Sequence, residues 1–356
     1  MSDVATTPAR EGFKAPGFLS RWETLIAALI VVVMIVGSGL SDQFLTTATI
    51  TTGSLDMIEV ALMALPLALV ITSAEIDLSI ASVLGLSSAV MAELWNQGLP
   101  LELIMPICIV MGGLCGAFNG FMVTRLGLPS LAVTIGTLAL FRGLAFVVIG
   151  DESVTDFPSV WTDRAFGTIG SWFPNVLVLF IALAVAFALL LHFTPFGRTV
   201  FAIGANEEAA RFSGVRVKRV KMTLFILSGA VAALAGIVIS LRNSTAAANV
   251  GSGFELTAVA AVVLGGVSIF GGKGTIGGVV LALILLGGIQ KALTLAEGVS
   301  SYWIQIVTGI LLIGSVLGPN LVSRAREART HTSRSRGSWP SRSVGHTNRP
   351  RKEEAE

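Results

Sequence analysis

Hydrophobic residues fill most of this chain in long runs that short polar stretches separate. Ten runs carry few or no charges over about 15 to 23 residues each. Because about 20 mostly apolar helical residues cross the hydrocarbon core of a bilayer, each run predicts a membrane-spanning helix, and shorter runs require tilt or cover from neighbours. The predicted spans are residues 24–40, 56–73, 78–95, 101–123, 131–149, 174–193, 222–241, 256–270, 275–296 and 302–318.

The composition agrees with this pattern. Hydrophobic residues make up 53 % of the chain and charged residues only 13 %, and the mean hydropathy is +0.81. Soluble domains carry roughly 25 % charged residues. The sequence therefore predicts an all-α, polytopic membrane protein with about ten transmembrane helices.

Lysine and arginine positions predict the orientation, because these residues favour the cytoplasmic side. With the N-terminus inside, 20 of the 24 basic residues fall on the cytoplasmic side and only two, Arg164 and Arg242, fall outside. Both termini are then cytoplasmic. Residues 1–22 form an N-terminal tail and residues 23–318 the membrane domain. The Arg- and Ser-rich residues 319–356 form a disordered basic tail that favours anionic lipid.

One short stretch concentrates charge between the sixth and seventh runs. Residues 204–221 read GANEEAARFSGVRVKRVK. Asn206 is a good N-cap, Glu207 and Glu208 favour the positive end of a helix dipole, and Arg211 favours the other end. Since Gly214 can adopt the left-handed conformation that ends a helix, we predict a cytoplasmic helix of about two turns.

The purpose of this helix stays open on physical grounds alone. A helix this short is marginal in water and needs tertiary contacts. Ala209 and Ala210 present a nearly bare backbone, which allows close approach to a partner protein. The alternative is a connector packed on its own bundle, and in both cases the basic residues that follow fix the topology.

Several motifs resemble the permease subunits of ABC importers for ribose, xylose, rhamnose and related sugars. The similarity extends over roughly residues 60–318. It is carried by the runs AEIDLSIASVLGLS (74–87), TRLGLPSLAVTIGTLALFRGLA (124–145), GRTVFAIGANEEAARFSGVRVKRVKM (197–222) and GFELTAVAAVVLGGVSIFGGKGTIGG (253–278).

This resemblance implies a multi-pass permease domain, in a bacterial cytoplasmic (inner) membrane, with a cytoplasmic coupling loop at residues 194–221. It implies three partners: a second permease subunit, a cytosolic ABC ATPase and an extracytoplasmic sugar-binding protein. The pattern is most similar to rhamnose-type permeases. The residues that would transmit ATPase closure to the spans are Asn206, Glu207, Glu208, Ala209, Ala210, Arg211 and Gly214. One departure is visible, because Ala74 and Glu75 occupy positions where the family usually has two glycines.

The chain lacks the residues that most enzymes need. A phosphate-binding G-x-x-x-x-G-K-[ST] loop is missing, since the lysine of the only Gly-Lys pair, at Lys273, is followed by Gly274. The three histidines are dispersed along the sequence. We therefore expect a transport subunit that does not hydrolyse ATP, with no cofactor, metal ion or nucleic-acid partner.

Polar residues near the spans are candidates for a translocation path: Asp77, Ser79, Asn119 and Glu255. Asp77-Leu78-Ser79 opens the third predicted span and Glu255-Leu256-Thr257 opens the eighth. In the predicted topology these starts lie on opposite sides, which suggests an inverted repeat of spans 2–5 and 7–10. Helix capping by the two acids, and helix-to-helix hydrogen bonding by Asn119, are the competing interpretations.

An ion-coupled secondary transporter of a small polar solute is the alternative function. It predicts acids near the middle of the membrane, whereas the acids here lie near the ends of spans. Arg142 and Lys291 fall within spans, where a charge needs protein contacts, a watery cavity or a path to the interface. For Lys291 we expect the side chain to reach the interface.

Overall fold

The computed structural model describes residues 21–170, 172–296 and seven further positions between 303 and 314. The described helices and strands are α1 (Arg21–Leu40), α2 (Thr47–Asp56), α3 (Ile58–Thr72), α4 (Ile80–Asn96), α5 (Leu101–Arg125), α6 (Ser130–Ile149), β1 (Ser153–Val154), α7 (Ser159–Phe166), β2 (Thr168–Ile169), β3 (Phe173–Pro174), α8 (Asn175–Phe193), α9 (Pro195–Ala205), α10 (Glu207–Phe212), α11 (Val217–Arg242), β4 (Ala246–Ala247), α12 (Phe254–Leu264) and α13 (Ile276–Leu295). Two antiparallel pairs, β1 with β4 and β2 with β3, contain all of these strands.

The predicted all-α membrane fold is confirmed. Six described helices, α1, α5, α6, α8, α11 and α13, are long and apolar enough to cross a membrane. The pair α2 and α3, bent by 50°, adds a seventh candidate, and α4 and α12 are shorter apolar helices. The first nine predicted runs thus each contain a helix. The tenth run and both tails lie largely outside the described residues, so the count of ten spans stays a prediction.

The eighth predicted run is shorter as a helix than the sequence indicates. We expected it to extend over residues 256–270, but α12 ends at Leu264. Gly265 and Gly266 follow, and Gly266 has φ of 87°, a conformation that glycine adopts without strain and that commonly ends helices. The Gly-rich remainder of the run forms a turn before α13.

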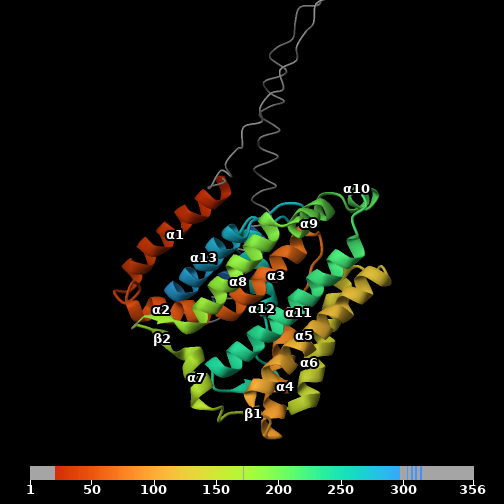
Figure 1. Cartoon of the computed structure of the whole chain (residues 1–356). Coiled ribbons are helices and arrows are strands. Elements are labelled where there is room, and N and C mark those ends of the chain that lie inside the picture. Colours follow the sequence, from red (N-terminus) through yellow and green to blue (C-terminus); the bar gives the residue numbers. More distant parts are fainter. Residues whose placement is uncertain are drawn as a thin grey trace, which may run out of the picture. The chain divides into compact units, whose positions relative to one another are not determined.

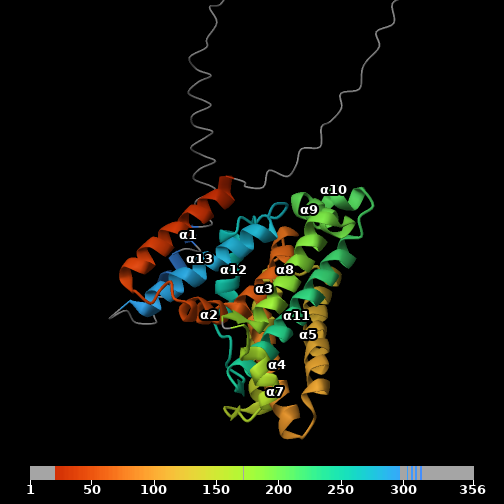
Figure 2. The same ribbon diagram turned by 60° about the vertical axis from the view of Figure 1, so that its left-hand side comes forward.

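Helix α3 lies at the centre of the molecule. All of its residues from Ile58 to Thr72 are buried, as expected for a helix that is apolar on every side. It packs against α8, α11, α12 and α13 (Figures 1 and 2). By contrast, α1, α5, α6 and α8 expose large apolar side chains, which suits contact with lipid; these include Val31, Ile35, Val110, Leu114, Ile135, Val147, Val178 and Leu189.

Small residues allow α5 and α11 to pack closely. Gly112, Gly116 and Gly120 recur every fourth residue along one face of α5. A Cβ atom on Gly116 would lie 2.0 Å from the carbonyl oxygen of Phe225 in α11. Membrane helices commonly approach one another through such small-residue faces, because lipid supplies no hydrophobic drive for helix association.

Ala74 occupies a strained turn between α3 and α4. Its φ is 63°, in the left-handed region that costs a residue with a side chain roughly 1–2 kcal/mol. Glycine is usual at this position in the family that the chain resembles. Alanine in place of glycine at position 74 therefore costs free energy through backbone strain.

We expect Ala74→Gly to stabilise the protein by about 0.5–1 kcal/mol, because relief of strain exceeds the added entropy of the unfolded chain. A thermal scan of the detergent-purified protein should show a melting temperature higher by about 2 °C. The matched control is Ala182→Gly, at an exposed position inside α8, which should destabilise by about 1 kcal/mol. A lower melting temperature for Ala74→Gly would contradict the strain.

Candidate functional site

Helix α10 confirms the local prediction for the charged stretch. The Asn206 side-chain oxygen accepts a hydrogen bond from the backbone N–H of Ala209 at 2.9 Å. Glu207 and Glu208 occupy the first turn and Arg211 the last turn. Gly214, just beyond the helix, has φ of 84°. The helix lies beside α9, at the end of the molecule opposite α7 and β1 (Figure 1).

The two faces of α10 differ in their contacts. Ala210 is buried against Ile203 of α9 and Val217 of α11, so it anchors the helix on its own chain. Glu208, Ala209 and Arg211 are exposed, and the Phe212 side chain is 91 % exposed. Of the residues predicted to contact the ATPase, Ala210 thus faces the chain itself, whereas Glu208, Ala209 and Arg211 face outward. The outward face also includes Phe212, which the sequence pattern did not single out.

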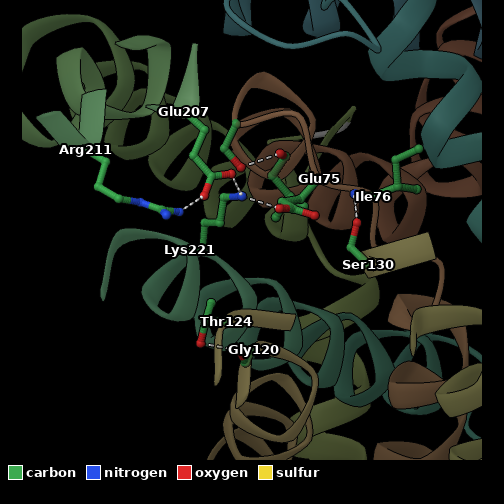
Figure 3. Close-up of polar contacts among 10 residues, drawn as sticks. Glu75, Ile76, Gly120, Thr124, Ser130, Glu207, Arg211 and Lys221 are labelled. Carbon is green, nitrogen blue, oxygen red and sulfur yellow. Dashed lines mark hydrogen bonds and ion pairs between the residues drawn. The ribbon is translucent and has the colours of Figure 1, made fainter. Parts of the chain in front are cut away.

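Two further charged residues, Lys221 and Glu75, connect α10 to the bundle through a chain of three ion pairs (Figure 3). Glu207 pairs with Arg211 at 2.6 Å, one turn along the same helix. The other carboxylate oxygen of Glu207 accepts from Lys221 Nζ at 2.6 Å, and Lys221 also donates to Glu75 Oε1 at 2.5 Å. The Lys221 hydrogen bond lowers the pKa of Glu207 below its usual value, with Arg211 contributing less.

A cleft of about 460 Å³ lies between α10, the start of α11 and the turn that joins α5 to α6. Its lining is largely polar and carries both signs of charge. The charged side chains that line it are Glu75, Arg125, Glu207, Arg211, Lys218 and Lys221.

Three of the four predicted path residues form one buried cluster. Asp77 accepts hydrogen bonds from the backbone N–H and hydroxyl of Ser79, at 3.0 and 2.6 Å. Its second oxygen accepts from the hydroxyl of Ser228 in α11 at 2.7 Å. Asn119 of α5 donates to the Ser79 hydroxyl at 2.8 Å, and its own buried carbonyl oxygen has no partner among the described residues.

Glu255, the fourth candidate, does not join this cluster. Its carboxylate accepts from the backbone N–H of Gly253 at 3.1 Å, at the exposed start of α12. Asp77 also bonds a backbone N–H near a helix start, so both acids make local capping contacts. Only Asp77 is buried, at 1 % exposure, and the proposed similarity between the two motifs stays a prediction.

Charged residues inside the bundle have protein partners. Arg142 donates to three carbonyl oxygens, those of Ala248, Val250 and Ala81, at 2.6–3.0 Å, and so holds the extended segment after α11 against α4. Lys291 pairs with Asp56 at 3.2 Å; the expectation that its side chain reaches the membrane interface stays a prediction.

A buried ion pair also joins α3 to α11. Arg242 Nε lies 2.8 Å from Glu59 Oε1, and the Glu59 side chain is fully buried. Among the described residues, no group of three His, Cys, Asp or Glu side chains is placed to hold a metal ion. The polar contacts described above are hydrogen bonds and ion pairs that join different helices.

Comparison with known proteins identifies the family. Residues 49–316 match the family model described as the permease component of a branched-chain amino acid transport system. The chain belongs to this permease family. No solved structure matches the permease.

Curated relatives cover nearly the whole permease. It is 34 % identical over 306 residues to the autoinducer 2 import system permease protein LsrD of Yersinia enterocolitica, a match that covers 84 % of this chain and 92 % of the relative. The LsrD protein of Yersinia pseudotuberculosis is 33 % identical, with 84 % and 91 % covered. That of Salmonella paratyphi A is also 33 % identical, with 83 % and 91 % covered.

These matches establish the class of protein. The permease is a multi-pass inner-membrane protein and the transport component of an ABC-type sugar importer, not an enzyme. An importer of this type works with an ATPase and an extracytoplasmic binding protein. The rhamnose-type substrate that we expected has no support here, because the relatives are named for autoinducer 2. The ion-coupled secondary transporter is not favoured.

Proposed function

We propose that this permease carries a small hydroxylated, sugar-like solute into the cytoplasm, with autoinducer 2 as the first solute to test. Similarity to LsrD proteins over more than four-fifths of the chain carries this proposal. Rhamnose and ribose are the comparison solutes, because the sequence motifs are similar to those of permeases for such sugars.

Helix α10 is the proposed contact of the permease with its ATPase. We place this helix in the cytoplasm because basic residues, which favour that side of the membrane, surround it. Arg198 lies on α9, and Arg216, Lys218 and Arg219 lie at the start of α11. Lys273 follows Gly272, which lies against Ala205 of α9. Its outward face, from Glu208 to Phe212, would contact the ATPase. A second permease subunit and a basic tail near anionic lipid complete the proposed assembly, in agreement with the resemblance.

An uptake experiment tests the solute class. The gene is deleted in its own host, and the deletion strain is complemented with the tagged permease or with an empty vector. We expect labelled autoinducer 2 to enter only the complemented cells, and excess unlabelled rhamnose or ribose to compete less well than unlabelled autoinducer 2. Equal autoinducer 2 uptake with the empty vector, together with permease-dependent uptake of another solute, would overturn the assignment.

The buried acid of the proposed path gives a sharper prediction. Asparagine can replace Asp77 with little change in shape, since its amide oxygen can still accept from Ser79 while its amide N–H groups meet the rotatable Ser228 hydroxyl. We therefore expect Asp77→Asn to express normally but to lower solute uptake about tenfold. The reason is that a buried carboxylate, which accepts three hydrogen bonds, is replaced by a neutral group.

The matched control is Glu255→Gln, at the exposed start of α12, which should keep uptake within about twofold. Full uptake by Asp77→Asn at wild-type expression would leave capping as the whole role of this acid. A strong loss of uptake with Glu255→Gln would instead support equivalent roles for the motifs that begin at Asp77 and at Glu255.

A further inference from the structure

Lys221 lies between two separate segments of the permease. Its ammonium contacts Glu207 at 2.6 Å, on α10, and Glu75 at 2.5 Å, in the turn between α3 and α4 (Figure 3). Lys221 itself belongs to the beginning of α11. The Lys221 side chain thus joins α10 to the turn between α3 and α4.

The pair formed by Lys221 and Glu75 is largely buried, at the inner wall of the cleft described above. Lys221 is 8 % exposed and Glu75 is 9 % exposed. An exposed ion pair contributes little, because water and salt screen it, whereas removal of one partner from a buried pair leaves an uncompensated charge. The pair therefore resists separation when either segment moves.

A second contact holds the same turn against the same helix. Ser228 lies seven residues, or about two helical turns, beyond Lys221, so both side chains project from one face of α11. Ser228 donates to Asp77 at 2.7 Å. The turn from Glu75 to Asp77 is thus fixed to α11 at two points, and its middle residue, Ile76, donates from its backbone to Ser130 of α6 at 3.1 Å.

We propose that Glu75 and Lys221 form a mechanical link that makes the Asp77 turn follow the movement of α10. This inference rests on the proposed docking of an ATPase on α10. When the ATPase shifts α10, Glu207 displaces Lys221, and Lys221 carries Glu75 and the adjoining Asp77 with it. Glu75 and Lys221 are positioning residues, since they act on the solute path through Asp77.

The link depends on a departure from the resembled family. A glycine at position 75, as that family usually has, carries no carboxylate for Lys221. Glu75 directly follows Ala74, the residue with φ of 63°, and accepts the hydrogen bond from Lys221.

The test measures how many solute molecules enter per ATP hydrolysed. The full complex, purified from the host through the tagged permease, is reconstituted in vesicles with its binding protein and the solute identified by the uptake assay. We expect Glu75→Gln and Lys221→Met each to lower this ratio about fivefold, while the ATPase subunit still co-purifies. Because the residues act as one link, the double variant should lower it no further than Lys221→Met alone.

Two further variants separate the link from general damage. Lys221→Arg keeps a cation in place and should restore most of the ratio. Arg219→Met removes an exposed charge from the same turn of α11, away from the cleft lining, and should keep the wild-type ratio. Arg219 itself forms no ion pair among the described residues.

Each outcome bears on the inference. A wild-type ratio in Glu75→Gln, or a proportional fall in uptake and hydrolysis that leaves the ratio unchanged, would overturn it. If the double variant shows the product of the single losses, the two residues act separately and the link is also refuted. Failure of the underlying docking proposal looks different, because the ATPase would then co-purify undiminished with the double variant Glu208→Arg with Arg211→Glu.

Discussion

Exchange of the charges of Glu208 and Arg211 is expected to release the ATPase subunit from the permease. The double variant Glu208→Arg with Arg211→Glu places a cation in the first turn of α10 and an anion in its last turn, which opposes the helix dipole. It also breaks the pair between Arg211 and Glu207 at 2.6 Å and reverses the charges on the exposed face. We expect the amount of co-purified ATPase to fall at least about tenfold, or about 1.4 kcal/mol in binding free energy.

A second variant tests the same surface without changing charge. Phe212→Ala removes an aromatic side chain that is 91 % exposed and that suits insertion into a partner, as interface anchors often do. Its loss should also weaken ATPase retention about tenfold. Neither change disturbs the buried anchor Ala210.

The matched control exchanges charges at the other end of the molecule. Glu152→Arg with Arg164→Glu alters two exposed residues between α6 and α8 and should leave ATPase retention unchanged. If the α10 variants retain the ATPase as well as this control does, α10 is a connector packed on its own bundle. That is the alternative that the sequence left open.

Gly116→Leu is expected to prevent assembly of the permease bundle. The new Cβ would lie 2.0 Å from the Phe225 carbonyl oxygen, and that atom belongs to helix backbone, which cannot rotate away. The two helices would have to separate and lose their close packing, a change that costs several kcal/mol. We expect the yield of monodisperse protein, measured by size-exclusion chromatography in detergent, to fall at least about tenfold.

Gly113, three positions away on the same helix, provides the control. The nearest atom to a Cβ built there is a methyl carbon of Ile226 at 3.8 Å, an ordinary contact distance. Gly113→Leu should therefore give close to the wild-type yield. Equal yields for the two leucine variants would show that α5 and α11 can separate at little cost.

Local signals in the sequence were sufficient to predict some of these features. Asn206, the two acids after it and Gly214 specify both ends of α10, because caps and dipole contacts involve neighbours in the chain. The apolar runs likewise specify where helices occur. The end of α12 was predicted too late, at residue 270, because the apolar composition continues past Gly266. The helix itself ends at Leu264.

Contacts between distant segments could not be predicted in the same way. Lys221 looked like one of several basic residues that fix topology, since its partner Glu75 is 146 positions away. The carbonyl partners of Arg142 carry no sequence signal at all. Asp77 and Ser79 were chosen as one local motif and Asn119 separately. Only helix packing brings Asn119 to Ser79 and adds Ser228 as an unforeseen member of the cluster.

Ion pairs at both ends of α3 and α11 have a consequence for how the solute path can open. Glu59 and Arg242 join the beginning of α3 to the end of α11, and Glu75 and Lys221 join the residues after α3 to the beginning of α11. These antiparallel helices are thus joined at both ends, and neither end can separate without depriving a largely buried carboxylate, Glu59 or Glu75, of its ion-pair partner. We therefore expect the proposed solute path beside Asp77 to open by movement of the surrounding helices relative to the joined pair α3 and α11.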